Sequence, residues 1–236
     1  TRAAQDAELV IVDSVTDDDQ QRIATAASAL ESDERSWVVF ESGPFGATYA
    51  HALGIRPHVD RANPILALIG SPTELTKLQS DRLESQSGVD LITVDDPASD
   101  VSQLLSRLRA SAEVGKTVIG IRTTSRDGSA PDPLHASQML TLIIDLAVEC
   151  ADSMQLDGIY ASGGDVAFAV LDALGARGYE VENEVVPLAV SGKLVGGPHD
   201  GLGFATKGGL VGDADAAVEC INQLRSRIRQ SEPRIV

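Results

Sequence analysis

Residues 159–167 read Ile-Tyr-Ala-Ser-Gly-Gly-Asp-Val-Ala, a pattern typical of a strand, a glycine-rich turn and the start of a helix. The apolar pattern of the helix continues from Val166 to Leu174. Glycines let the backbone approach a ligand closely, and the free N–H groups at a helix N-terminus favour an anion. The stretch therefore predicts a strand–turn–helix unit that could bind an anion. A plain tight turn with Asp165 as a helix cap explains the same residues.

A second glycine-rich turn follows another apolar strand pattern, where residues 203–213 read Gly-Phe-Ala-Thr-Lys-Gly-Gly-Leu-Val-Gly-Asp. Lys207 could offer a cation to a phosphate, while Gly208 and Gly209 offer backbone N–H groups. The pair Gly70-Ser71 also ends a strand pattern, and Ser71 suits either a ligand contact or the N-cap of the following helix. Our hypothesis is that these turns jointly hold the phosphates of a nucleotide.

The composition restricts the classes of partner. The chain has 35 acidic and 19 basic residues, which disfavours nucleic acid because phosphate backbones are bound by clustered Lys and Arg. Cys150 and Cys220 lack CxxC spacing, so we expect reduced thiols and a cytoplasmic location. We recognise no signal peptide and no apolar run long enough to cross a membrane, and therefore expect no membrane partner.

Strand and helix patterns alternate over most of the chain. This alternation predicts an α/β fold of three layers, with a mostly parallel sheet, helices on both faces and some antiparallel strands near the C-terminus. Ligands of such folds bind at the carboxyl ends of the strands, where the glycine-rich turns fall. The expected strands are residues 8–13, 37–40, 65–69, 89–94, 117–121, 158–161 and 203–206, with extended segments at 179–190 and 193–196.

Several common sites are absent from the sequence. No GxGxxG follows the first strand, and no GxxxxGK[ST] or GxSxG occurs, which disfavours a dinucleotide fold of that type, a P-loop enzyme and a serine hydrolase. The four histidines lack metal-ligand spacing, so we predict no metal held by protein side chains alone. We treat residues 1–236 as one domain with a sub-boundary near 56–64.

Four motifs in one order resemble the C-terminal, nucleotide-binding half of the four-carbon acid sugar kinases, a family once known only as DUF1537. The resemblance covers nearly the whole chain. The motifs are VIVDSVTDDD near the start, IGSPTELTKLQ at 69–79, SGGDVAFAVLDALG at 162–175 and GFATKGGLVGDADA at 203–216.

The resemblance implies an ATP-dependent kinase that phosphorylates a small acid sugar such as a 3-oxo-tetronate, threonate or erythronate. It implies ATP contacts on Gly70-Ser71, on Gly163–Val166 (Gly163, Gly164, Asp165 and Val166) and on Gly209, with Mg²⁺ arriving with the nucleotide. Lys207 and Gly208 complete the last turn. The family's Asp-Asp-x-Thr-Gly-Ala motif does not occur, so we expect this chain to lack the N-terminal substrate domain. A domain face left open in this way would also suit a homodimer.

The sequence departs from the family pattern at two turns. Leu210-Val211 stands where the family more often has a residue followed by an aromatic side chain, and residues 41–46 differ from a Gly-Ser-Ala-Gly-like segment. These departures leave an alternative open, a non-catalytic module that binds a nucleotide or another anion and has kept the fold.

Overall fold

The computed structural model describes residues 9–32, 36–40, 45–54, 63–70, 73–124 and 132–231. The chain forms two compact units, Thr1–Arg61 and Ala62–Val236. The division between them falls inside the Pro-containing stretch 56–64, where the sequence suggests a sub-boundary. The larger unit carries all the strands among the described residues.

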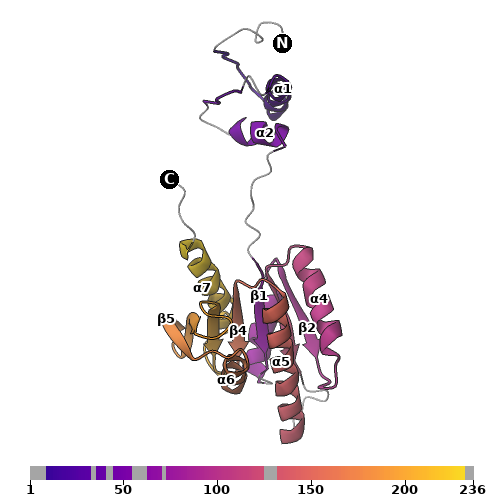
Figure 1. Ribbon diagram of the computed structural model, residues 1–236, viewed down its shortest axis with the longest axis vertical. Helices are drawn as coiled ribbons and strands as arrows, with labels where there is room; N and C mark the ends of the chain where they lie inside the picture. Colours follow the sequence, from indigo (N-terminus) through magenta and orange to yellow (C-terminus); the bar gives the residue numbers. More distant parts are fainter. Residues whose placement is uncertain are drawn as a thin grey trace. The chain divides into compact units, whose positions relative to one another are not determined.

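A seven-stranded mixed sheet forms the centre of the larger unit (Figure 1). The strand order is β2-β3-β1-β4-β7-β6-β5. The first five strands in this order run parallel, whereas β6 and β5 are antiparallel to their neighbours. This arrangement confirms the predicted α/β fold. The strands are β1 Ile65–Ile69, β2 Val89–Val94, β3 Val118–Thr123, β4 Gly158–Ser162, β5 Gly178–Val186, β6 Ala189–Val195 and β7 Gly203–Lys207.

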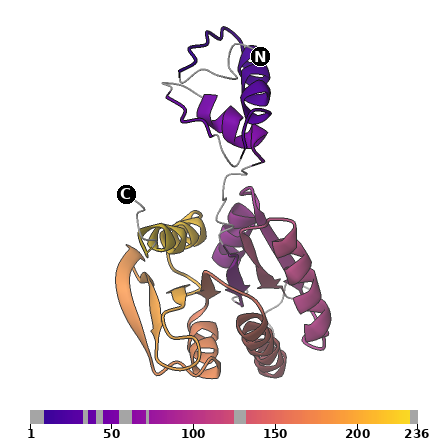
Figure 2. The ribbon, with the colours of Figure 1, turned by 45° about the horizontal axis from the view of Figure 1, so that its top comes forward.

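Helices cover both faces of the sheet (Figures 1 and 2), because alternate strand residues point to opposite faces. On one face, Leu68, Ile121 and Ala161 lie in a core with residues of α4 (Val101–Glu113), α5 (Pro133–Ser153) and α6 (Gly164–Ala173). On the other face, Ile69 and Tyr160 lie in a core with residues of α3 (Glu74–Glu84) and α7 (Ala216–Ser231). The central strands β1 and β4 are buried along their whole length, which explains their continuous apolar sequences.

Helix α5 differs from what we expect of the sequence in one respect. By length and composition it is the single helix in the described part of the chain that could cross a membrane, so the expectation of no such segment is wrong. Its buried residues pack in one core with residues of α4 and α6, and this packing accounts for the apolar composition of α5. They are Met139, Leu142, Ile143, Leu146, Ala147 and Cys150.

The smaller unit contains two helices, α1 (Asp17–Ser28) and α2 (Phe45–Ala52). Thr16 and Asp19 form a capping box at the start of α1, as the Thr-Asp-Asp-Asp sequence favours. The hydroxyl of Tyr49 on α2 donates a hydrogen bond to Glu31, which also accepts from the backbone N–H of Trp37 at 2.9 Å. These contacts link the two helices through the segment between them.

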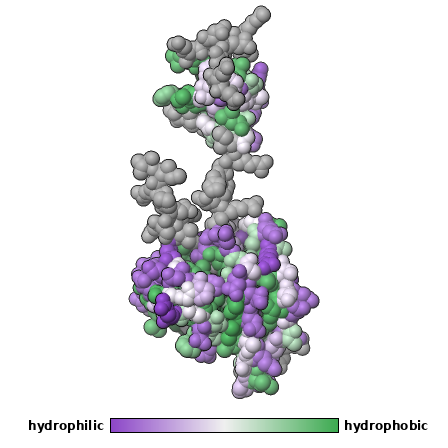
Figure 3. Space-filling view, in the orientation of Figure 1, coloured by the Kyte–Doolittle hydropathy of each residue, from purple (hydrophilic) through white to green (hydrophobic). Residues whose placement is uncertain are grey.

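The strands predicted at 8–13 and 37–40 are wrong over their described residues. No strand forms at 9–13 or 36–40, and Ile11 and Phe40 are 86% and 94% exposed. Figure 3 shows hydrophobic side chains at the surface of this unit. A continuous apolar run forms a buried strand only where other strands pair with its backbone and other elements cover its faces. The described residues of this unit supply neither.

Two local predictions in the larger unit also need correction. The N-cap of α3 is Thr73, whose hydroxyl accepts from the backbone N–H of Thr76 at 3.2 Å, and not Ser71. The antiparallel hairpin turns at residues 187–188, earlier than the break that the sequence suggests at 191–192. Leu188 adopts a φ of 70° there, which lets the chain reverse within two residues.

Candidate functional site

Parallel pairing brings three glycine-containing turns to one edge of the sheet. Ile69, Ser162 and Lys207 are the last residues of β1, β4 and β7, and they are aligned across the three strands. The residues that follow each strand therefore emerge side by side. The backbone connects them, since the N–H of Gly70 donates to Ser162 O at 3.3 Å and that of Gly163 donates to Lys207 O at 2.9 Å.

Helix α3 fixes the third turn in place. The hydroxyls of Thr73 and Thr76 both lie 2.9 Å from the carbonyl oxygen of Gly209. Farther along the same helix, the buried amide of Gln79 donates to Val211 O at 3.0 Å and to the Asp213 carbonyl at 2.6 Å. The Thr-x-x-Thr-x-x-Gln spacing puts these three side chains on one face of the helix. The helix that follows Gly70 thus sets the position of Gly209.

The start of α6 forms the second turn. Gly163 is the N-cap residue, with φ 115° and ψ 132°, a conformation that glycine adopts far more readily than other residues. The first N–H groups of an α-helix have no partner within the helix, and Gly163 supplies no side chain to cap those of α6. Gly164 is exposed, and a Cβ added there would meet nothing within 4 Å. This geometry leaves several N–H groups open to an anion.

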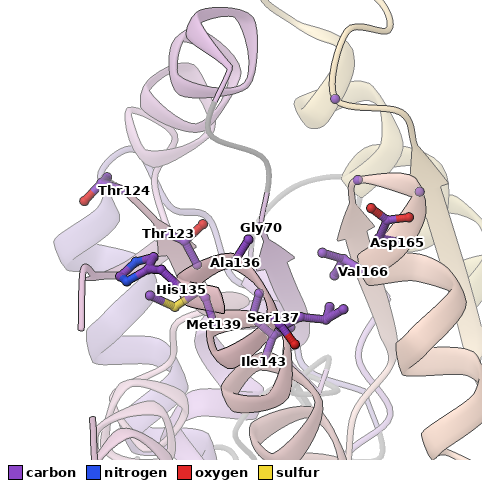
Figure 4. A pocket seen from close by; sticks show the side chains of 14 residues that line it. Gly70, Thr123, Thr124, His135, Ala136, Ser137, Met139, Ile143, Asp165 and Val166 are labelled. Carbon is purple, nitrogen blue, oxygen red and sulfur yellow. The ribbon is translucent and has the colours of Figure 1, made fainter. Parts of the chain in front are cut away.

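A cavity of about 530 Å³ opens between these turns and the N-terminal half of α5 (Figure 4). Its volume lies within the range of small-molecule sites. On one side the lining residues come from the turns and α6, and they are Gly70, Gly163, Gly164, Asp165, Val166 and Gly209. On the other side they come from the end of β3 and from α5, and they are Thr123, Thr124, His135, Ala136, Ser137, Met139, Leu140 and Ile143.

The structure brings together most of the residues that the sequence singles out. Gly70, Gly163–Val166 and Gly209 all line the cavity. Gly208 is half-buried beside Gly209 and does not line it. Ser71 lies outside the described residues.

Lys207 has surroundings that the sequence does not reveal. It is 2% exposed, it does not line the cavity, and its ammonium donates to Gly208 O at 3.0 Å. Its side chain shares a sheet face with Tyr160 and Ser162, toward α7. Burial lowers the pKa of Lys207, and burial likewise raises the pKa of the Cys220 thiol on α7 to about 12. Lys207 is thus a buried, hydrogen-bonded side chain behind the turns.

Sequence reasoning missed the α5 side of the cavity. Thr123 ends β3 and Thr124 follows it, and His135 and Met139 lie in the first turns of α5. These residues belong to the site because β3 lies next to β1 in the sheet, so that its carboxyl end reaches the same edge. Strand order is a tertiary property, so the sequence alone did not show this neighbourhood.

Within the described residues, no group of three or more His, Cys, Asp or Glu side chains could hold a metal ion. Among the described residues that line the cavity, Asp165 is the single carboxylate, and they include no Lys or Arg. These described residues alone would leave a divalent cation to share its coordination with the ligand.

The chain is similar to a known family and to known kinases. The sequence model of the family described as "Nucleotide-binding C-terminal domain" matches residues 66–217. The D-erythronate kinase of Heliobacterium modesticaldum is 34% identical, over 93% of this chain and 54% of that protein. The D-threonate kinase of Salmonella typhimurium is 28% identical, over 89% of this chain and 53% of that protein. The chain spans about half the length of the curated relatives it matches.

A solved structure from Bordetella bronchiseptica, described as a domain of unknown function (DUF1537), has a TM-score of 0.60 and 26% identity. The match covers 95% of this chain and 55% of that one. That protein was crystallised as a domain-swapped dimer with bound citrate. The Haemophilus influenzae protein HI1011 shares the fold, with a TM-score of 0.57 and 17% identity.

Proposed function

Because the chain belongs to the nucleotide-binding C-terminal domain family of the four-carbon acid sugar kinases, we propose that it binds ATP at the cavity beside the three glycine turns. The observation that carries the proposal is the connection of these turns by hydrogen bonds at one edge of the sheet. Gly70, Gly163–Val166 and Gly209, which the family resemblance singles out for ATP contacts, line the same cavity. Ser71 follows Gly70 directly and completes the proposed set.

The residues present suit a triphosphate. Backbone N–H groups at the start of α6 can donate to phosphate oxygens, and the helix dipole favours negative charge there. Gly70 also has no room for a side chain, since an added Cβ would lie 2.5 Å from Val166 Cγ2. No Lys or Arg is among the described residues that line the cavity, so Mg²⁺ would neutralise much of the phosphate charge, and Asp165 is the carboxylate among them best placed to assist it. Behind the turns, the buried Lys207 donates a hydrogen bond from its Nζ to Gly208 O at 3.0 Å, which helps to hold the last turn in place.

For the whole protein we propose an ATP-dependent kinase in the cytoplasm that phosphorylates a four-carbon sugar acid. The named relatives are a D-erythronate kinase and D-threonate kinases, and this chain corresponds to about half of each. The role of the chain's own residues is to bind and orient the nucleotide. A substrate domain supplies the acceptor site, and the domain-swapped dimer of the Bordetella protein supports a homodimer in this case too.

Isothermal titration of the 236-residue chain with ATP and Mg²⁺ tests the proposal. We expect saturable heat at millimolar ATP or below, with a matched titration of Mg²⁺ alone as the baseline. Gly209→Val should weaken binding, because it adds a branched side chain at a turn that lines the cavity. Gly178→Val serves as the control, because Gly178 is an exposed strand residue without a positive φ and does not line the cavity. Absence of heat with ATP would remove the basis for the proposal.

A further inference from the structure

Resting on the proposed function, we propose that the α5 side of the cavity is the nucleobase site, where His135, Met139 and Leu140 contact the faces of the adenine ring. The two sides of the cavity differ in chemistry. The turn side offers backbone N–H groups of glycines, whereas the α5 side offers side chains (Figure 4). Figure 4 shows Thr123, Thr124, His135 and Met139 across the cavity from Asp165 and Val166.

The charge of a ligand group decides whether it suits the α5 side of the cavity. A phosphate or a sugar-acid carboxylate needs a cation or several N–H donors, and the described lining residues include neither Lys nor Arg. An adenine ring is flat and neutral and buries well against apolar and polarisable side chains. With the triphosphate on the glycine turns, the ribose and the base are the remaining parts of ATP, and the α5 side is the wall left for the flat, neutral base.

The packing of α5 makes this wall rigid and largely apolar. Met139 and Ile143 are 5% and 1% exposed and belong to the core beneath the cavity, together with Val166. Leu140 and His135 are half-buried and lie above that floor. A thioether beside a ring makes favourable sulfur–aromatic contacts, and an imidazole can stack on the ring face. The side chains therefore form a platform that exists before the ligand arrives.

Polar groups at the carboxyl end of β3 can form hydrogen bonds with the edge of the base. The hydroxyls of Thr123 and Thr124 can donate or accept hydrogen bonds, and both residues are half-buried beside the platform. Thr124 is held in place because its backbone N–H donates to Val94 O at 3.1 Å. A few fixed polar groups around an apolar slot are the usual means of orienting a small ligand.

Two tryptophan substitutions on α5 test the assignment. Ala136 is exposed and lines the cavity, so Ala136→Trp should fill the space proposed for the base without opening a hole in the core. Gln138 is exposed on the same helix and does not line the cavity, so Gln138→Trp is the matched control. Circular dichroism of both variants verifies that they fold as the wild-type chain does.

The affinities for ATP and for inorganic tripolyphosphate, each with Mg²⁺, are then compared by calorimetry. Wild type should bind ATP more tightly than tripolyphosphate, and Ala136→Trp should lose roughly 5- to 150-fold of ATP affinity, the range typical of one stacked base. Its tripolyphosphate affinity, and both affinities of Gln138→Trp, should stay at the wild-type level.

The outcomes separate this inference from the proposed function. Equal wild-type affinity for ATP and tripolyphosphate, or unchanged ATP binding in Ala136→Trp, overturns the base site and leaves the phosphate site standing. If wild type binds neither compound, the proposed function fails and the base site fails with it.

Discussion

Replacing Gly163 by alanine should destabilise the larger unit, because the native turn requires a backbone conformation that a Cβ disfavours. Gly163 has φ 115° and ψ 132° at the N-cap of α6. Holding a non-glycine residue in such a region costs about 1–3 kcal/mol. For a unit of this size, each kcal/mol lowers Tm by about 2–4 °C, so Gly163→Ala should melt about 2–12 °C below wild type.

Gly164→Ala is the matched control one residue later in the same turn. Gly164 is the first residue of α6, and a Cβ there would meet nothing within 4 Å. Alanine is favoured over glycine in a helix by about 0.5–1 kcal/mol, so this variant should melt at or slightly above the wild-type temperature. The pair therefore separates backbone strain from the mere loss of a glycine.

The assay is thermal unfolding followed by far-ultraviolet circular dichroism, without nucleotide. Tryptophan fluorescence would report the wrong unit, because the single Trp of the chain is Trp37 in Thr1–Arg61. ATP titrations on the folded variants should show a larger loss of affinity for Gly163→Ala than for Gly164→Ala. Identical melting of the two variants would refute the reasoning, since the strain at Gly163 would then be absent.

Three further predictions concern Gly70, Lys207 and the hydrogen bond between Thr76 and Gly209. Gly70→Ala would place a Cβ 2.5 Å from Val166 Cγ2, so unfolding in urea should show a loss of about 1–3 kcal/mol from overpacking, and calorimetry should show weaker ATP binding. Burial lowers the pKa of Lys207, so the unfolded chain binds more protons between that lowered pKa and the ordinary lysine value. The free energy of unfolding should therefore rise with pH through this window in wild type, and Lys207→Met should flatten the rise. If urea unfolding gave both proteins the same dependence of this free energy on pH, the prediction would be contradicted. Thr76→Val removes a buried hydroxyl that lies 2.9 Å from Gly209 O, and should cost about 0.5–1.5 kcal/mol, because Gly209 O loses one hydrogen bond and keeps that from Thr73. Hydrogen exchange across 207–213 measures whether the turn loosens, and unchanged exchange there would show that Thr73 alone holds it.

The sequence by itself determined the α/β class, most strand positions of the larger unit and the identity of the glycine turns. These features are local: a strand buried on both faces has a continuous apolar sequence, and a turn such as Gly163-Gly164 needs residues without a Cβ. The prediction that ATP contacts lie on these turns rests on a family resemblance and stays a prediction, although the structure places Gly70, Gly163–Val166 and Gly209 around one cavity.

Only the tertiary structure decided the rest, because strand order and neighbouring elements lie outside the reach of a local pattern. The apolar run at 9–13 reads like the buried strand β1, yet it forms no strand in the described part of its unit, where nothing pairs with it. Lys207 follows an apolar strand before two glycines, but alternation along β7 turns its side chain into the core behind the turns. The α5 wall enters the site because β3 lies beside β1, a pairing between residues more than fifty positions apart.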